Sequence, residues 1–132
     1  MTVHVQWEND SRTAIRQIFD PQWRWQDYDD SVETIREMVK SVDHIVHVIS
    51  DVRASTPQIQ GLAWEHFRRS LRDIPHNAGM LIVAGNGHFT ASLFSLYVQA
   101  DPKLVRRTRF VSTIAEAHSV IRQFPNPLHT LN

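Results

Sequence analysis

The chain has 132 residues, of which 42% are hydrophobic and 21% charged, and its 14 basic residues balance its 14 acidic ones. This length predicts one domain with a sizeable core, and the balanced charge gives no electrostatic driver for binding nucleic acids or anionic membranes. Cysteine is absent, which excludes disulfides, thiolate catalysis and cysteine metal sites and is compatible with a reducing cytoplasm. The N-terminus is not typical of a signal peptide, and no apolar run is long enough to span a bilayer. We therefore expect a soluble, cytoplasmic protein.

Alternating apolar residues near the N-terminus predict a β-hairpin. Val3, Val5 and Trp7 alternate with polar residues, and "NDSR" has turn chemistry before a second strand-like stretch, "TAIRQIF". We therefore expect a hairpin over residues 3–19. From Trp25 onward, apolar residues recur at steps of three and four, which predicts an amphipathic helix with aspartates in its first turn.

Two near-continuous apolar runs, residues 44–50 and 79–85, predict strands that are covered on both faces. We expect 45–49 and 80–84 to be adjacent, central, fully buried parallel strands. His47 lies within the first run and is predicted to be a hydrogen-bonded core histidine. Between the runs, apolar residues at helical spacing, from Ile59 through Leu71 to Ile74, predict a second helix.

The remaining elements complete an alternating order of strands and helices. A third helix is predicted from residue 89 to about residue 100, and "TRFVS" is a short strand. Thr113 and Glu116 form a capping box that opens a last helix. The order predicts an α/β fold: an N-terminal hairpin, then βα units forming a mainly parallel sheet flanked by about four helices. Residues 1–124 form the single domain, and 125–132 a loose C-terminal tail.

The stretch "VAGNGHF" joins a predicted strand to a predicted helix through two glycines. It lacks the third glycine of a dinucleotide-binding fingerprint and the lysine of a P-loop, so neither nucleotide site is indicated. A weak anion site at Gly87 and His88, at the start of a helix, is one interpretation. The interpretation that we favour is a tight strand-to-helix turn permitted by the glycines.

Several polar residues are expected where the carboxyl ends of the strands meet, the edge at which open α/β sheets bind ligands. These include Asp51, Arg53, Ser55, Thr56 and His88. Asp51, Ser55 and His88 supply the residue types of a hydrolase triad, but the sequence has no nucleophile-elbow motif around Ser55. The histidines show no spacing typical of a zinc motif, so no metal and no cofactor are predicted.

The loop after the central strand leads into a helix that carries Trp64 and Arg68. Tryptophan and arginine are the residue types most enriched at binding hot spots, although a tryptophan at the rim of the core is an equally good interpretation of Trp64. Pro57 restricts the loop and lowers the entropy lost on binding. The predicted partner-binding residues are Asp51, Arg53, Ser55, Thr56, Ile59, Trp64 and Arg68.

Over roughly residues 3–123 the chain resembles the STAS-domain superfamily, the bacterial anti-sigma-factor antagonists and their relatives. The likeness rests on "WRWQDYDDSVETIREMVKSV" after a strand pair, on "HIVHVISDV" as the central strand with Gly61 at the next helix, and on "RFVSTIAEAHSVI" as part of the closing units. The resemblance implies a non-enzymatic regulatory module that binds a protein partner and is often switched by phosphorylation.

The phosphorylated serine of that superfamily precedes a glycine at the second helix. Ile59 and Gln60 precede Gly61 here, so the only hydroxyls in the loop are those of Ser55 and Thr56, several residues earlier. They are the candidate phosphorylation sites. The arrangement also resembles CRAL-TRIO-like domains, which implies a small apolar-ligand or lipid carrier as an alternative, and the Ser55 hydrolase is a third hypothesis. A second copy of the chain, forming a homodimer, is a further candidate partner.

Overall fold

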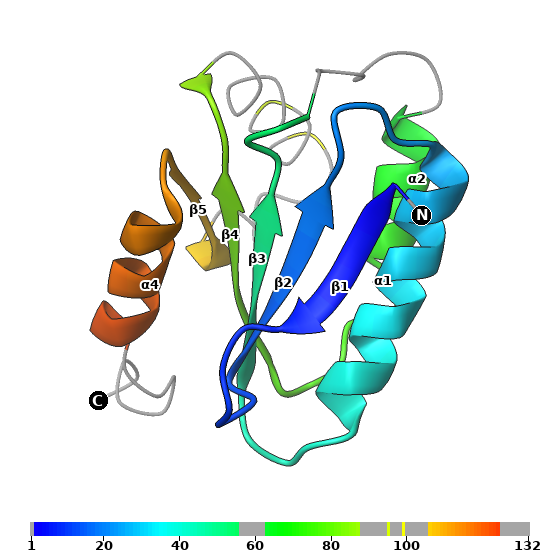
Figure 1. Ribbon diagram of the computed structural model, residues 1–132. Helices are drawn as coiled ribbons and strands as arrows, with labels where there is room; N and C mark the ends of the chain where they lie inside the picture. The colour runs from blue at the N-terminus through cyan, green and yellow to red at the C-terminus, as the bar shows by residue number, and fades with distance from the viewer. Residues whose placement is uncertain (1, 56–62, 88–94, 96–98, 100–105, 125–132) are drawn as a thin grey trace.

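The computed structural model describes residues 2–55, 63–87, 95, 99 and 106–124. These residues form an α/β fold with one five-stranded sheet in the order β1-β2-β3-β4-β5 (Figure 1). The strands are β1 (Val3–Trp7), β2 (Ala14–Phe19), β3 (Val46–Asp51), β4 (Ala78–Ala84) and β5 (Thr108–Val111). The helices within the described ranges are α1 (Trp25–Lys40), α2 (Ala63–Ser70) and α4 (Ile114–Gln123).

The sheet confirms the predicted hairpin and the mainly parallel arrangement. β1 pairs with β2 antiparallel, and every later pair of neighbouring strands is parallel. In the hairpin turn, the side chain of Asn9 accepts a hydrogen bond from the backbone N–H of Thr13 (3.0 Å) and donates to its hydroxyl (2.8 Å). Arg12 takes a left-handed φ of 55°. The turn chemistry read from "NDSR" is therefore made by an asparagine side chain closing the loop.

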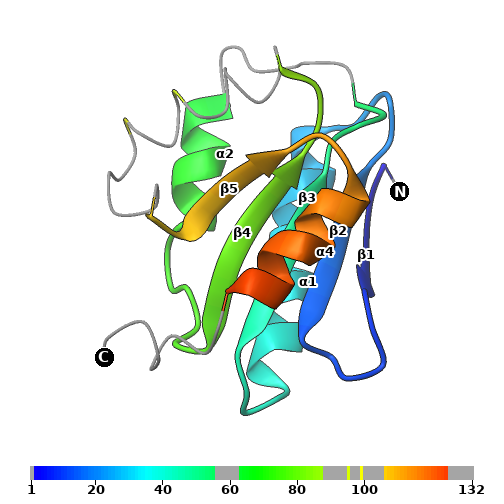
Figure 2. The ribbon, with the colours of Figure 1, turned by 90° about the vertical axis from the view of Figure 1, so that its left-hand side faces the viewer.

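Three layers build the molecule, with α1 and α2 on one face of the sheet and α4 on the other (Figures 1 and 2). Under α1 and α2 lie two hydrophobic clusters, one around Phe19, Trp23 and Val83 and the other around Ile15 and Val46. Under α4 lies a third cluster, formed by Ile49, Met80, Ile82, Ala84, Val111 and Ala117. Alternate residues of each inner strand serve the two faces, which explains why β3 and β4 read as continuous apolar runs.

β3 and β4 are adjacent and parallel inside the sheet, as predicted. The expectation that residues 45–49 and 80–84 are fully buried is wrong at Ile45, which precedes β3, and at Val48 and Leu81 within the strands; all three are half-buried. Val48 and Leu81 are register partners, and both side chains belong to the face that α1 and α2 cover. These two side chains are therefore partly accessible on that face.

Helix boundaries follow the sequence only in part. The capping box is confirmed, because the Thr113 hydroxyl accepts from the Glu116 N–H (3.1 Å) at the start of α4. The second helix ends at Ser70, so Ile74 is not on its inner stripe and is 43% exposed. The described residues contain three of the expected four helices. The predicted third helix and the tail 125–132 lie outside the described residues, apart from Ser95 and Gln99.

A buried network of hydrogen-bonded side chains connects α1 to the middle of the sheet. The Gln17 amide donates to the Ser31 hydroxyl (2.8 Å) and accepts from the Ser50 hydroxyl (2.7 Å), and Ser31 in turn donates to the Tyr28 carbonyl (2.7 Å). All three polar side chains are less than a tenth exposed. Because each polar group of this network has a partner, the network fixes the position of α1 without leaving an unsatisfied donor.

His47 is the hydrogen-bonded core histidine that the sequence predicts. The residue is 8% exposed, and its ring packs edge-on against Phe124 and accepts a hydrogen bond at Nδ1 from the backbone N–H of Met80 (2.9 Å). The β3–β4 register is irregular at this point, so the imidazole replaces a strand carbonyl as the acceptor. Gly79 allows this approach: a Cβ there would lie 2.5 Å from Nδ1.

Candidate partner-binding site

The carboxyl ends of β2, β3 and β4 point to one edge of the sheet, at the top of Figure 1. Segments 20–24, 52–55 and 85–87 follow these strands and meet at this edge. The structure thus brings the first half of the predicted docking loop to the position expected for a ligand or partner site in an open α/β sheet.

Asp51 and Arg53 form a two-point ion pair in this loop. Arg53 donates from Nε to Oδ1 (2.9 Å) and from Nη2 to Oδ2 (3.0 Å), and its backbone N–H also donates to Oδ1 (3.2 Å). Burial raises the pKa of the Asp51 carboxyl, but the hydrogen bonds from Arg53 outweigh burial and the pKa lies below its ordinary value. The same bonds raise the pKa of Arg53. Both groups therefore stay charged over the physiological pH range.

The two members of this pair differ in exposure. The side chain of Asp51 is 7% exposed, whereas that of Arg53 is 45% exposed. The carboxylate thus acts as a buried anchor that holds a surface guanidinium in one orientation. A fixed guanidinium loses little rotamer entropy when it meets a planar anionic group such as a carboxylate.

Ser55 lies inside the protein rather than on the loop surface. It is 6% exposed, and its hydroxyl accepts a hydrogen bond from the Trp23 indole N–H (2.6 Å). Trp23 belongs to an aromatic cluster with Phe19, Trp25 and Tyr28. A kinase acting on Ser55 would have to open the loop and remove this acceptor from the indole.

The other predicted site residues are placed only in part. Arg68 is exposed on α2, and its guanidinium pairs with Glu65 (3.2 Å) on the same helix. Thr56, Ile59 and His88 lie outside the described residues, and so does the side chain of Trp64. Within the described part, the structure brings Asp51, at the end of β3, together with Arg53 and Ser55 in the loop that follows.

The glycine turn is tied to the sheet through Gly85. This residue is buried, and its N–H donates to the carbonyl of Val111 (3.0 Å) at the end of β5. Gly87 is exposed, its φ is not left-handed, and a Cβ there would meet nothing within 4 Å. The backbone at position 87 would therefore accept a Cβ, and the interpretation of the segment as a turn that the glycines permit stays a prediction. The weak anion site at Gly87 and His88 stays a prediction.

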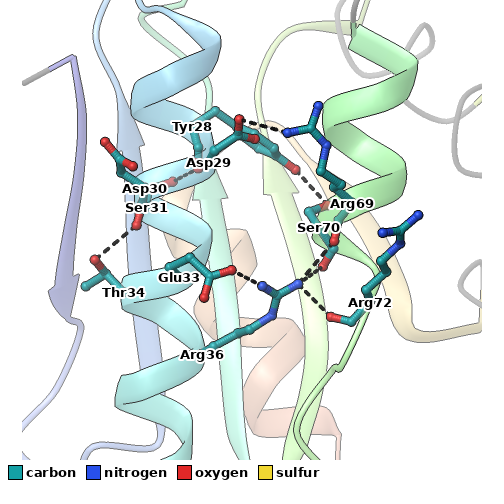
Figure 3. A network of polar contacts seen from close by, with 10 residues as sticks. All are labelled: Tyr28, Asp29, Asp30, Ser31, Glu33, Thr34, Arg36, Arg69, Ser70 and Arg72. Carbon is teal, nitrogen blue, oxygen red and sulfur yellow. Dashed lines mark hydrogen bonds and ion pairs between the residues drawn. The ribbon is translucent and has the colours of Figure 1, made fainter.

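Helix α2, which follows the docking loop, is held to α1 by polar contacts (Figure 3). The Nη2 of Arg36 donates to the backbone carbonyls of Arg69 (3.1 Å), Ser70 (3.3 Å) and Arg72 (2.6 Å), and the guanidinium also pairs with Glu33. These bonds satisfy carbonyls at the end of α2 and place a cation at the negative end of its dipole. The C-terminal end of α2 is thus fixed to the body of the protein.

Among the described residues, three histidines have carboxylate partners that sequence spacing did not indicate. His4 Nε2 lies 3.1 Å from Asp20 across the hairpin, and the other two histidines reach partners much farther away in the sequence. His66 Nδ1 lies 2.8 Å from Asp29, and its ring stacks on Trp25 with a centroid distance of 5.0 Å. His118 on α4 lies 3.1 Å from Glu8, which also binds Arg16 (2.6 Å). Partners more than thirty residues apart leave no local signal. In the described part of the chain, no group of three or more histidine and acidic side chains is placed to hold a metal ion.

Comparison of the chain with models of protein families, with curated proteins and with solved structures found no match. Within the described ranges, none of the helices is both long enough and apolar enough to cross a membrane.

Proposed function

We propose that this protein is a non-enzymatic regulatory module that docks a protein partner at the carboxyl edge of its sheet. The observation that carries the proposal is the Asp51–Arg53 pair, in which a buried carboxylate fixes a half-exposed guanidinium. The Nη1 group takes no part in the two side-chain bonds to Asp51. It is the part of the side chain best suited to donate to an acidic group on the partner.

The bonds made by Asp51 and Ser55 favour docking over hydrolysis. Both oxygens of Asp51 are bound by Arg53, and the Ser55 hydroxyl is bound by Trp23. A triad would need Asp51 to orient a histidine and Ser55 to face a substrate. Hydrophobic clusters lie on both faces of the described sheet, which favours a packed core over the cavity of an apolar-ligand carrier.

The wider setting is part of the same proposal. A STAS-like regulatory role in the bacterial cytoplasm follows from the sequence resemblance and agrees with the lack of cysteine. The switch by phosphorylation would act at Ser55 or Thr56. Ser55 is buried, so a phosphate on its hydroxyl would need space and solvent that the present packing does not give, and phosphorylation would rearrange the loop that presents Arg53.

The test is to capture the partner from the native cell by cross-linking, purify it, and titrate it with variants. Arg53→Ala alone would leave the buried Asp51 carboxylate unpaired, so the variant of choice is Asp51→Asn with Arg53→Ala. We expect its dissociation constant to rise at least roughly tenfold, the scale of a hot-spot arginine. Arg122→Ala, an exposed arginine on α4, is the matched control and should bind as the parent does. Equal binding by both variants would place the docking surface elsewhere.

A further inference from the structure

Among the described residues, the outer edge of β1 carries backbone groups without a strand partner, in a regular pattern. The pairs Glu8–Ala14 and Thr2–Asp20 are hydrogen-bonded across the hairpin, so the same register makes His4 and Gln6 bond to β2. The residues between them, Val3, Val5 and Trp7, direct their N–H and C=O groups away from β2. No described segment pairs with this side of β1, which forms one margin of the sheet in Figure 2.

The two margins of the sheet differ in their protection. β5 has only four residues, and Arg109 folds back so that Nη1 donates to the carbonyls of Thr108 (3.0 Å) and Arg106 (3.4 Å). Charged side chains and shortness are devices that block strand addition. β1 has five residues, "VHVQW", with no lysine, no proline and an unbroken register. Of the two edges, only β1 lacks these devices.

From this we infer that β1 is a strand-addition edge and that its occupant is a second copy of this chain, forming a continuous sheet across a two-fold axis. An antiparallel pairing centred on Val5 places Val5 opposite Val5 of the second copy and Val3 opposite Trp7. These are the residues whose N–H and C=O groups point outward, so each pair exchanges two hydrogen bonds. The edge is therefore complementary to itself, as a two-fold interface requires.

The side chains agree with this register. On one face it brings Val3, Val5 and Trp7 of the two copies together, and on the other face it places His4 opposite Gln6. No formally charged side chain stands opposite one of the same sign. His4 and Gln6 are exposed in the single chain, so they can be changed without disturbing the core. Because the contact is one short strand pair, we expect a weak, concentration-dependent dimer. This inference does not rest on the proposed docking site at the carboxyl edge.

Hydrogen exchange at two protein concentrations tests the pairing directly. The amides of Val3, Val5 and Trp7 should exchange quickly in dilute protein and become protected in concentrated protein. The amides of His4 and Gln6 bond to β2 in both states, so they should stay protected throughout and serve as the internal control. If the odd-numbered amides remain unprotected while the protein dimerises, the edge is not the interface.

Two double variants test the register by sedimentation velocity. His4→Lys with Gln6→Lys places lysine opposite lysine across the axis, whereas His4→Lys with Gln6→Glu places lysine opposite glutamate at both positions. We expect the dissociation constant of the first to be roughly tenfold higher than that of the second, because like charges directly opposite are destabilising. Equal values for the two variants would overturn the inference. So would a parent chain that sediments as a 15.3 kDa monomer up to its highest soluble concentration.

Discussion

Gly79→Ala is expected to be one of the most destabilising single-methyl changes in this protein. The new Cβ would lie 2.5 Å from Nδ1 of His47 and 2.8 Å from Cγ2 of Ile45. Both neighbours would have to move, and movement of the imidazole would break the hydrogen bond that it accepts from the buried N–H of Met80.

The magnitude follows from two contributions. Leaving the buried Met80 N–H without an acceptor costs about 1–3 kcal/mol. Forcing a methyl group into a filled space costs about 1–3 kcal/mol more. We therefore expect the free energy of unfolding to fall by about 2–6 kcal/mol, a large fraction of the roughly 5–15 kcal/mol of a typical domain.

Urea unfolding of four proteins measures the effect: the parent, Gly79→Ala, His47→Ala and the double variant. Because His47→Ala already removes both the acceptor and the clashing ring, adding Gly79→Ala to it should cost clearly less than in the parent. The coupling should reach about 0.5–3 kcal/mol. Gly87→Ala is the matched control, since its Cβ meets nothing, and it should change stability by less than about 1 kcal/mol. A Gly79→Ala variant within roughly 0.5 kcal/mol of the parent, or strictly additive costs, would refute this account of the β3–β4 irregularity.

Two further predictions concern His47 and Ser55. Burial lowers the pKa of His47 below 6.5, so its contribution to stability is complete above about pH 6.5 and is lost as the pH falls through the lowered pKa. Urea unfolding between about pH 8 and pH 5 should show this decline, and an equal decline in His47→Gln would contradict the assignment to His47. Ser55→Ala should cost about 1–3 kcal/mol because it removes the acceptor of the buried Trp23 indole. Ser112→Ala, at an exposed serine, is its control in the same assay, and equal stability of the two variants would show that the Trp23 bond contributes little.

Local patterns were enough to predict most of the described fold. The alternation around Val5 predicts β1, and Thr113 with Glu116 predicts the start of α4, because the interactions involved span only a few residues. The end of α2 at Ser70 was not predictable in this way. It depends on Arg36 from another helix, and the apolar Ile74 extends the helical pattern past the true end.

In the candidate site too, features set by neighbouring residues were predictable and features set by distant contacts were not. Asp51 and Arg53 are two residues apart, so a shared position after the central strand was predictable, although their pairing was not predicted. The bond from Trp23 to Ser55 spans 32 residues and depends on the placement of two loops after different strands. Sequence reasoning therefore placed Ser55 on an accessible loop, whereas the fold buries it against an indole.

The strictly consecutive strand order has a consequence for folding during synthesis. Each strand pairs with the one made just before it, so the sheet can grow in one direction as the chain emerges, without waiting for a distant partner. The face beneath α4 is different, because the helix that covers it comes after the last strand. Until α4 is made, Ile49, Met80 and Ile82 have no cover from it. A ribosome-bound chain that stops before α4 should therefore be the form that chaperones bind and proteases remove first.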